Sequence, residues 1–219
     1  MGESITGPVA VLGYSADQVR AAEAPLLAAG VPLMARAAAG LAAAIRELAP
    51  ERVLLLVGSG DNGGDALFAG AELARDGVTV QILRTGERVH GAGLRAALDA
   101  GAVPVDSVPD ELDVVVDGIL GIGAGAGSAL RGRARTTVEA VLTRAQRARV
   151  VAVDIPSGVD PDEGTVTDAV VLPADLTVTF GAVKAGLLLG AGAELAGRVS
   201  LIEIGLDLTG VTPLVERET

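Results

Sequence analysis

The stretch VLLLVGSGDNGGDALFAG, residues 53–70, decides the fold. Five apolar residues, 53–57, run into a glycine-rich loop, and the loop runs into a segment with helical character. This order predicts a buried strand, a tight turn and a helix. Gly58, Gly60 and Gly63 also satisfy the pattern GxGxxG, which in dinucleotide-binding domains brings a phosphate to a helix N-terminus.

The same alternation continues along the chain on both sides of this stretch. Further strands are predicted at 78–83, 113–117, 150–154, 174–180 and 198–204, with a weaker one at 103–105. Helices are predicted at 15–29, 32–48, 63–76, 88–100 and 134–147. Alternating strands and helices predict an α/β fold with a parallel sheet covered on both faces. About fifty residues of helix precede the first strong strand, whereas a Rossmann domain usually begins with its strand.

The length of 219 residues predicts one domain, which we assign to residues 1–206. Residues 207–219 lose the periodicity and are interpreted as a C-terminal extension or a truncated linker. The mean hydropathy of +0.50 is high, but in the richest apolar stretch, 21–45, Glu23, Pro25, Pro32 and Arg36 interrupt the run. A membrane span needs about 18 uninterrupted apolar residues, so we expect none.

Composition excludes several functions. The net charge is 17 − 28 = −11 and aromatic residues make up 1% of the chain, so both charge and the lack of stacking surfaces argue against nucleic acid as a partner. Cysteine is absent, which excludes disulfides and thiolate chemistry. The N-terminal residues do not resemble a secretory signal, and we expect a cytoplasmic protein.

One interpretation of the glycine pattern is an NADP-linked oxidoreductase. Arg84, about twenty residues past Gly63, would then recognise a 2′-phosphate. Two carboxylates in the loop, Asp61 and Asp65, argue against this interpretation because they repel a pyrophosphate. The sole histidine, His90, lies in a predicted turn and is expected to be solvent-exposed.

Acidic side chains also follow two other predicted strands. DVVVD ends at Asp117 and VVAVD ends at Asp154, and each is followed by a loop that contains glycine. The carboxyl ends of parallel strands line one crevice, so these acids are expected to meet the residues 61–65 there, although each could instead cap a helix or brace a turn. Lys184 is the only lysine in the chain, which indicates either a local need for a compact ammonium or a surface residue without function. The oxygen-bearing Asn62, Asp117 and Ser157 suit a hard cation, an alkali or alkaline-earth ion, and argue against zinc.

These segments resemble one family, the NAD(P)H-hydrate epimerases, also called the YjeF N-terminal domain. The matching stretches are SGDNGGD (59–65), DGILGIGAGAG (117–127), VDIPSGVDPDEG (153–164), FGAVKAGLLLGAG (180–192) and AGRVSLIEIGL (196–206). The resemblance implies a Rossmann-like three-layer α/β/α sandwich with a mainly parallel central sheet and N-terminal helices. It implies an isomerase that interconverts the R and S forms of hydrated NADH and NADPH (NADHX and NADPHX), with a dehydratase as functional partner that is often fused C-terminally in bacteria.

The resemblance also assigns residues. Asp154 is the expected acid/base catalyst, and potassium is the expected cofactor, bound by Asn62, Asp117 and Ser157. The chemistry of the reaction, rather than the resemblance, leads us to expect that Lys184 tunes the Asp154 carboxylate or holds a phosphate. A homodimer is also expected. The remaining predicted substrate contacts are Asp61, Asn62, Gly63, Gly64, Asp65, Gly121, Ile122, Gly123, Ala124, Gly125, Ala126 and Gly127.

The chain departs from the family pattern at three places. The family usually has Asn at position 61, Gly where Ala66 stands, and often an arginine in the glycine loop, which here reads AGAGSALRG. A catalytically degenerate module that binds a nucleotide or a partner protein is therefore an alternative to the epimerase, beside the oxidoreductase.

Overall fold

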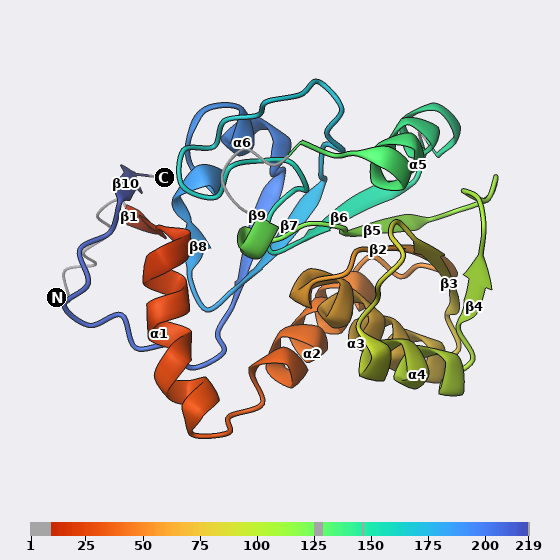
Figure 1. The fold of residues 1–219 in the computed structure, drawn as a ribbon, viewed down its shortest axis with the longest axis horizontal. Helices are drawn as coiled ribbons and strands as arrows, with labels where there is room; N and C mark the ends of the chain where they lie inside the picture. Colours follow the sequence, from red (N-terminus) through yellow and green to blue (C-terminus); the bar gives the residue numbers. More distant parts are fainter. Residues whose placement is uncertain (1–9, 125–128, 146, 219) are drawn as a thin grey trace, which may run out of the picture.

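The computed structural model describes residues 10–124, 129–145 and 147–218, and its centre is a seven-stranded sheet (Figure 1). The strand order is β4-β3-β2-β5-β6-β7-β9, and every neighbouring pair is parallel. The strands are β2 (Arg52–Val57), β3 (Thr79–Arg84), β4 (Val103–Val105), β5 (Val114–Gly118), β6 (Arg149–Val153), β7 (Leu176–Phe180) and β9 (Arg198–Ile202). The order reverses between β2 and β5, and in doubly wound sheets ligands bind at such a switch point.

The central strands β2, β5 and β6 are buried on both faces because they consist mainly of apolar residues. Along β2, Val53, Leu55 and Val57 belong to one core, whereas Leu54 and Leu56 belong to the other. Successive side chains of a strand point to opposite faces, so a continuous apolar run serves two layers. Each such side chain stabilises the fold by about 1.5–3 kcal/mol when fully buried.

Helices cover the two faces unequally. The helices α2 (Leu33–Arg46), α3 (Asp61–Arg75) and α4 (Gly91–Asp99) pack on one face and α5 (Gly132–Arg144) on the other (Figure 1). The three layers confirm the predicted α/β/α fold. A short helix, α6 (Gly190–Leu195), and the 3-10 turns η1 (Ile122–Ala124) and η2 (Ala185–Leu187) had not been predicted.

Helix α1 (Ala16–Ala28) stands apart from the sheet, and the chain turns sharply between it and α2 (Figure 1). Its N-terminus is set by a capping box, in which the Gln18 backbone N–H donates to Ser15 Oγ and the Ser15 N–H donates to Gln18 Oε1. In the part of the chain that the structure describes, no single helix is long and apolar enough to cross a membrane, although α1 and α2, bent by 117°, pass that test as a pair.

The expectation that the chain begins with helices was wrong in one respect. A strand, β1 (Ala10–Tyr14), precedes α1 and belongs to a second sheet of three strands, with the order β10-β1-β8. Its neighbours are β8 (Val183–Lys184), which is parallel to it, and β10 (Val215–Glu218), which is antiparallel. Residues 215–218, at the end of the sequence, thus pair with the segment before the first helix. All three strands are short, and strands of two to five residues carry little periodicity of their own.

Candidate active site

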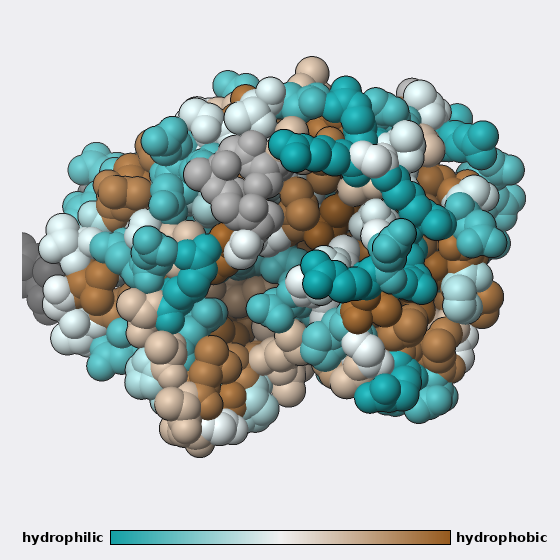
Figure 2. All heavy atoms as spheres, viewed as in Figure 1, coloured by the Kyte–Doolittle hydropathy of each residue, from teal (hydrophilic) through white to brown (hydrophobic). Residues whose placement is uncertain are grey.

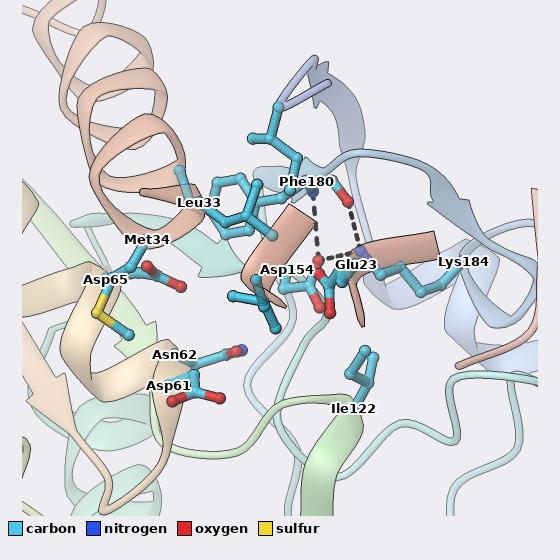
Figure 3. A pocket seen from close by; sticks show the side chains of 13 residues that line it. Glu23, Leu33, Met34, Asp61, Asn62, Asp65, Ile122, Asp154, Phe180 and Lys184 are labelled. Atoms are coloured by element: carbon cyan, nitrogen blue, oxygen red, sulfur yellow. Dashed lines mark hydrogen bonds and ion pairs between the residues drawn. The ribbon is translucent and has the colours of Figure 1, made fainter. Parts of the chain in front are cut away.

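A cavity of about 210 Å³ opens at the carboxyl edge of the central sheet. In the space-filling view the surface is hollowed between α1 and α2, near this position (Figure 2). Side chains from both sheets and from three helices reach the cavity. Its lining consists of Glu23, Leu27, Leu33, Met34, Ala37, Asp61, Asn62, Asp65, Ile122, Asp154, Phe180, Lys184 and Ile204 (Figure 3).

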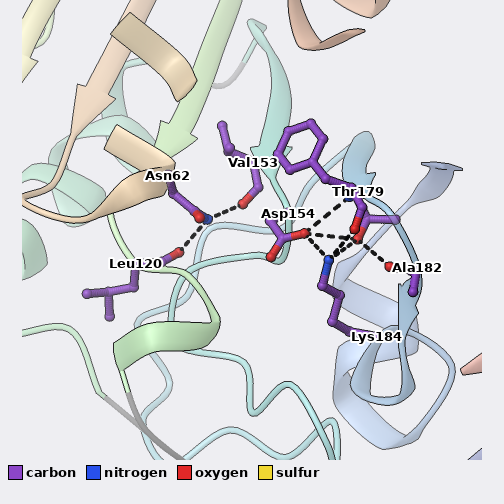
Figure 4. Close-up of polar contacts among 8 residues, drawn as sticks. Asn62, Leu120, Val153, Asp154, Thr179, Ala182 and Lys184 are labelled. Carbon is purple, nitrogen blue, oxygen red and sulfur yellow. Dashed lines mark hydrogen bonds and ion pairs between the residues drawn. The ribbon is translucent and has the colours of Figure 1, made fainter. Parts of the chain in front are cut away.

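Asp154 and Lys184 form a buried ion pair on the wall of this cavity (Figure 4). Their side chains are 7% and 1% exposed. Strand β6 ends at Val153, one residue earlier than predicted, and Asp154 follows it with a φ of +67°. Such a conformation is unfavourable for a residue other than glycine and is held only by strong surrounding contacts.

Those contacts all converge on one oxygen of Asp154. Its Oδ1 accepts hydrogen bonds from Lys184 Nζ, from Thr179 Oγ1 at 3.1 Å and from the Phe180 backbone N–H at 3.3 Å. Lys184 Nζ also donates to the Phe180 carbonyl at 2.9 Å and to Thr179 Oγ1 at 3.2 Å. Within the described ranges no donor reaches Oδ2, so one oxygen anchors the carboxylate and the other is free to meet a ligand.

Asp65 brings a second buried carboxyl group to the cavity from α3. The residue is 6% exposed, and its Oδ1 is buried without a hydrogen-bond partner in the described part of the chain. Burial raises the pKa of Asp65 to about 8, and the negative charges of Asp154, Asp61 and Glu23 add to this effect, while Lys184 opposes it. At neutral pH the Asp65 carboxyl is therefore mainly protonated.

Glu23 adds a further acid from α1, which the sequence analysis did not identify. Burial raises the pKa of this half-buried carboxyl group, Asp154 and Asp61 raise it further, and Lys184 and Arg20 lower it. Nothing in the helical segment around Glu23 distinguishes it from a solvent-facing residue. Only the turn between α1 and α2 places it over the carboxyl ends of the strands.

The three predicted metal ligands come together beside the cavity. The Asn62 Nδ2 donates to the carbonyls of Val153 at 2.5 Å and Leu120 at 3.1 Å (Figure 4). Ser157 Oγ donates to Asp117 Oδ1 at 2.7 Å and lies 3.3 Å from the Leu120 carbonyl oxygen. The Leu120 N–H in turn donates to Ser157 Oγ at 2.8 Å. One connected network therefore links the loops that follow β2, β5 and β6.

This network fits a hard monovalent cation. Asp117 is completely buried, and this burial raises its pKa, whereas the hydrogen bonds from Ser157 and Ile119 lower it. No basic side chain pairs with Asp117 in residues 10–124, 129–145 and 147–218. A buried carboxylate without a counter-charge is costly, and a cation removes that cost. The donors are oxygen atoms, and the described residues contain no group of three His, Cys, Asp or Glu side chains that could hold a metal.

The predicted glycine contacts divide into two groups. Gly63 and Gly64 are buried in the first turn of α3, which begins at Asp61, two residues earlier than predicted. Gly121 approaches Asn62 so closely that a Cβ there would lie 2.2 Å from Asn62 Oδ1. In the same turn Gly123 is exposed and Ala124 ends η1, whereas Gly125, Ala126 and Gly127 lie outside the described residues.

Arg84, which together with the glycine pattern motivated the oxidoreductase interpretation, does not line the cavity, and neither does His90. The Arg84 guanidinium donates to the Glu87 carbonyl, next to its own strand. His90 is half-buried, contrary to expectation, because its Nδ1 accepts from the Gly93 N–H at 3.1 Å as the N-cap of α4. Its ring also meets Phe68 edge-on with the ring centroids 5.5 Å apart. The contacts of His90 are those of a helix cap and a packed ring, which are structural.

Comparison with known proteins identifies the family. The sequence model of the protein family described as YjeF-related protein N-terminus matches residues 30–186. A protein of Clavibacter michiganensis subsp. michiganensis named NAD(P)H-hydrate epimerase is 57% identical over 219 residues, covering 93% of this chain and 94% of the relative. The bifunctional NAD(P)H-hydrate repair enzyme Nnr of Mycobacterium tuberculosis is 47% identical over 207 residues, which are 89% of this chain and 42% of that protein.

The fold comparison agrees with the sequence comparisons. The crystal structure of yeast ynu0 superposes with a TM-score of 0.71 at 18% identity and covers 86% of each chain. At this identity the likeness concerns the fold alone. The family match over residues 30–186 and the extended identity to these relatives lead to one conclusion: this chain belongs to the family of YjeF-related protein N-termini.

Proposed function

We propose that the protein is an NAD(P)H-hydrate epimerase, an isomerase that interconverts the R and S forms of hydrated NADH and NADPH. The observation that carries this proposal is the Asp154 carboxylate, anchored through Oδ1 by Lys184 and free at Oδ2, on the wall of a cavity. The names of the relatives at 57% and 47% identity support the same activity.

The chemistry needs an acid, a base and a stabiliser of positive charge. The hydrate carries its hydroxyl on C6, next to the ring nitrogen N1. Protonation lets the hydroxyl leave as water while the N1 lone pair forms a C6=N1 iminium, and water then adds to the opposite face of the planar ring. Asp154 is assigned an acid/base role in these proton transfers and the stabilisation of the cation.

The charges around the cavity suit this intermediate. Four carboxyl groups line the cavity, those of Glu23, Asp61, Asp65 and Asp154, and Lys184 is the sole basic residue among its lining residues. A site of this kind favours a neutral ring that becomes cationic and disfavours a phosphate. The volume of about 210 Å³ lies below the roughly 300–1,000 Å³ of pockets that enclose a drug-sized ligand. We infer that the hydrated ring enters the cavity and that the rest of the dinucleotide lies outside it.

Potassium is proposed as the cofactor, held by Asn62, Asp117 and Ser157. The cation would balance the buried Asp117 charge and hold together the loops after β2, β5 and β6. We further propose that the protein acts in the cytoplasm as a homodimer beside a dehydratase that consumes the S form. The bifunctional name of the mycobacterial relative supports the dehydratase partner.

A coupled assay tests the epimerase directly. The R hydrate is incubated with the protein and an S-specific dehydratase, and recovery of the reduced-nicotinamide absorbance is followed. The epimerase restores absorbance beyond the spontaneous rate, whereas no acceleration at any hydrate concentration would contradict it.

Two other functions give different results in this experiment. A module that only binds a nucleotide or partner, motivated by Asp61 in the first turn of α3, binds the hydrate without accelerating its epimerisation. An NADP-linked oxidoreductase consumes NADPH when a second substrate is supplied. The position of Arg84 outside the cavity lining argues against the oxidoreductase.

A further inference from the structure

In the proposed reaction, water leaves one face of the substrate ring and returns to the other. Acid/base groups must therefore be able to reach both faces of the ring from the walls of the cavity. A carboxyl group on one wall reaches only the ring face that is turned towards that wall. A single Asp154 anchored by three hydrogen bonds cannot swing around the ring between the two half-reactions. The chemistry therefore calls for a second acid/base group on a different wall.

We propose that Asp65 is that group: a second catalytic carboxyl that serves the ring face opposite to the one served by Asp154. This inference rests on the proposed epimerase function and deepens it. Asp65 projects from α3, on the side of Leu33 and Met34, and Asp154 projects from the turn after β6, on the side of Lys184 (Figure 3).

The surroundings of the two carboxyl groups differ. Asp154 is paired with an ammonium and accepts two further hydrogen bonds. Asp65 has a buried Oδ1 without a partner, and burial raises its pKa to about 8. The charged groups that act on it are Glu23 on α1, Asp61 on its own helix, Asp154 after β6 and Lys184 on β8. Two carboxyl groups in such different surroundings are the usual arrangement for an acid and a base in one site.

Each proton in one turnover has a donor and an acceptor. Asp65 donates its proton to the C6 hydroxyl, the C–O bond breaks, water leaves, and the N1 lone pair forms the C6=N1 bond. Asp154 removes a proton from a water on the other face, the new C–O bond forms, and the π electrons return to N1. The enzyme ends with Asp65 ionised and Asp154 protonated. It can convert the opposite epimer in this state, or it returns to the first state by proton transfer through water.

Oxygen exchange separates this arrangement from a single acid/base residue. In H₂¹⁸O, each carboxyl can exchange the hydroxyl on its own face without inversion. We expect Asp65→Asn to lower epimerisation by about 10²–10⁴-fold while it still exchanges ¹⁸O into one epimer with retention. Asp154→Asn should then exchange only the other epimer. All rates are measured above the spontaneous rate, with potassium present, and folding is checked by circular dichroism.

Each outcome decides the proposal. Complementary exchange in the two variants supports it. Epimerisation by Asp65→Asn within tenfold of the unaltered protein, or exchange of the same epimer in both variants, would overturn it. If the unaltered protein does not accelerate epimerisation, the proposed function fails, and this failure is visible before any variant is made.

A pH profile of the unaltered protein provides a second test that does not depend on the folding of a variant. Only the singly protonated carboxyl pair is active, so kcat/KM in both directions should fall about tenfold per pH unit above about 8, where Asp65 loses its proton. Constant kcat/KM from pH 7 to pH 10 would overturn the assignment.

Discussion

Lys184, the only lysine of the chain, forms an ion pair with Asp154 although 30 residues separate them. The pair depends on the second sheet, because Lys184 lies in β8, in register with Tyr14 of β1. The three-stranded sheet therefore positions the Lys184 ammonium next to the Asp154 carboxylate, which faces the cavity.

Replacement of Lys184 by Met should destabilise the protein strongly. Removing one partner of a buried ion pair leaves the other charge uncompensated, at a cost of about 3–5 kcal/mol. Chemical denaturation measures this loss in the free energy of unfolding. The double variant Lys184→Met/Asp154→Asn should recover part of it, and Arg149→Met, at an exposed position, serves as the control. A loss in the double variant that equals the sum of the losses in Lys184→Met and Asp154→Asn would show that the two side chains are not coupled.

Asp154→Asn should abolish epimerisation and leave binding of the hydrate largely intact. The amide keeps the shape of the side chain but does not transfer protons, so the loss appears in kcat, by at least about 10²-fold. The coupled assay and calorimetric titration with the hydrate measure the two quantities. Asp175→Asn, at the opposite edge of the sheet, where Asp175 accepts from the Val150 N–H, should keep its activity. Near-normal turnover by Asp154→Asn would remove Asp154 from the mechanism.

Potassium should raise the thermal stability of the protein, and tetramethylammonium at the same ionic strength should not. A ligand that binds only the folded state stabilises it in proportion to the logarithm of its concentration, so the melting temperature should rise with potassium concentration. Asp117→Asn should abolish the dependence. Asp113→Asn, at the other end of β5, should retain it. The same melting curve in both salts would argue against a potassium site.

Gly121→Ala should weaken the proposed potassium site by displacing Asn62. A Cβ at this position would lie 2.2 Å from Asn62 Oδ1, so Asn62 must move away from the Leu120 and Val153 carbonyls. We expect a lower melting temperature and a weaker response to potassium. Gly123→Ala is the matched control, because a Cβ there meets no atom within 4 Å. If both variants melt alike, the close approach of Gly121 is not what holds Asn62.

Asp65 should also make stability depend on pH. Its pKa rises from 3.8 to about 8 on folding, so at pH values below about 4 both states are protonated and the full stability is present. Between pH 4 and 8 the unfolded state ionises and the folded state does not, so the free energy of unfolding falls by a few kcal/mol, at about 1.4 kcal/mol per unit.

In the Asp65→Asn variant, the free energy of unfolding should not show this decrease between pH 4 and pH 8. At pH 8 the variant should be more stable than the unaltered protein. Asp99→Asn, at an exposed position of α4, provides the control. A variant that matches the pH dependence of the unaltered protein would show that Asp65 is not buried as a neutral acid.

The central sheet was predictable because its signal is local. Most strands of that sheet contain a short run of apolar or β-branched residues, and the glycines after β2 indicate a turn. The convergence of Asp117 and Asp154 at one edge followed from the geometry of parallel strands. The second sheet was missed, because β1, β8 and β10 are short and lie far apart in the sequence.

The sequence by itself determined the α/β fold, the family and the oxygen-bearing residues at the strand ends, because periodicity and motif spacing are properties of neighbouring residues. Only the tertiary structure decided that Lys184 neutralises Asp154, that Glu23 covers the cavity and that Asp65 is buried without a partner. Protonation and pairing depend on the desolvation of a group and on the charges that surround it. For these residues, the surroundings come from segments that are distant in the chain, and they exist only after the two sheets and the helices have packed together.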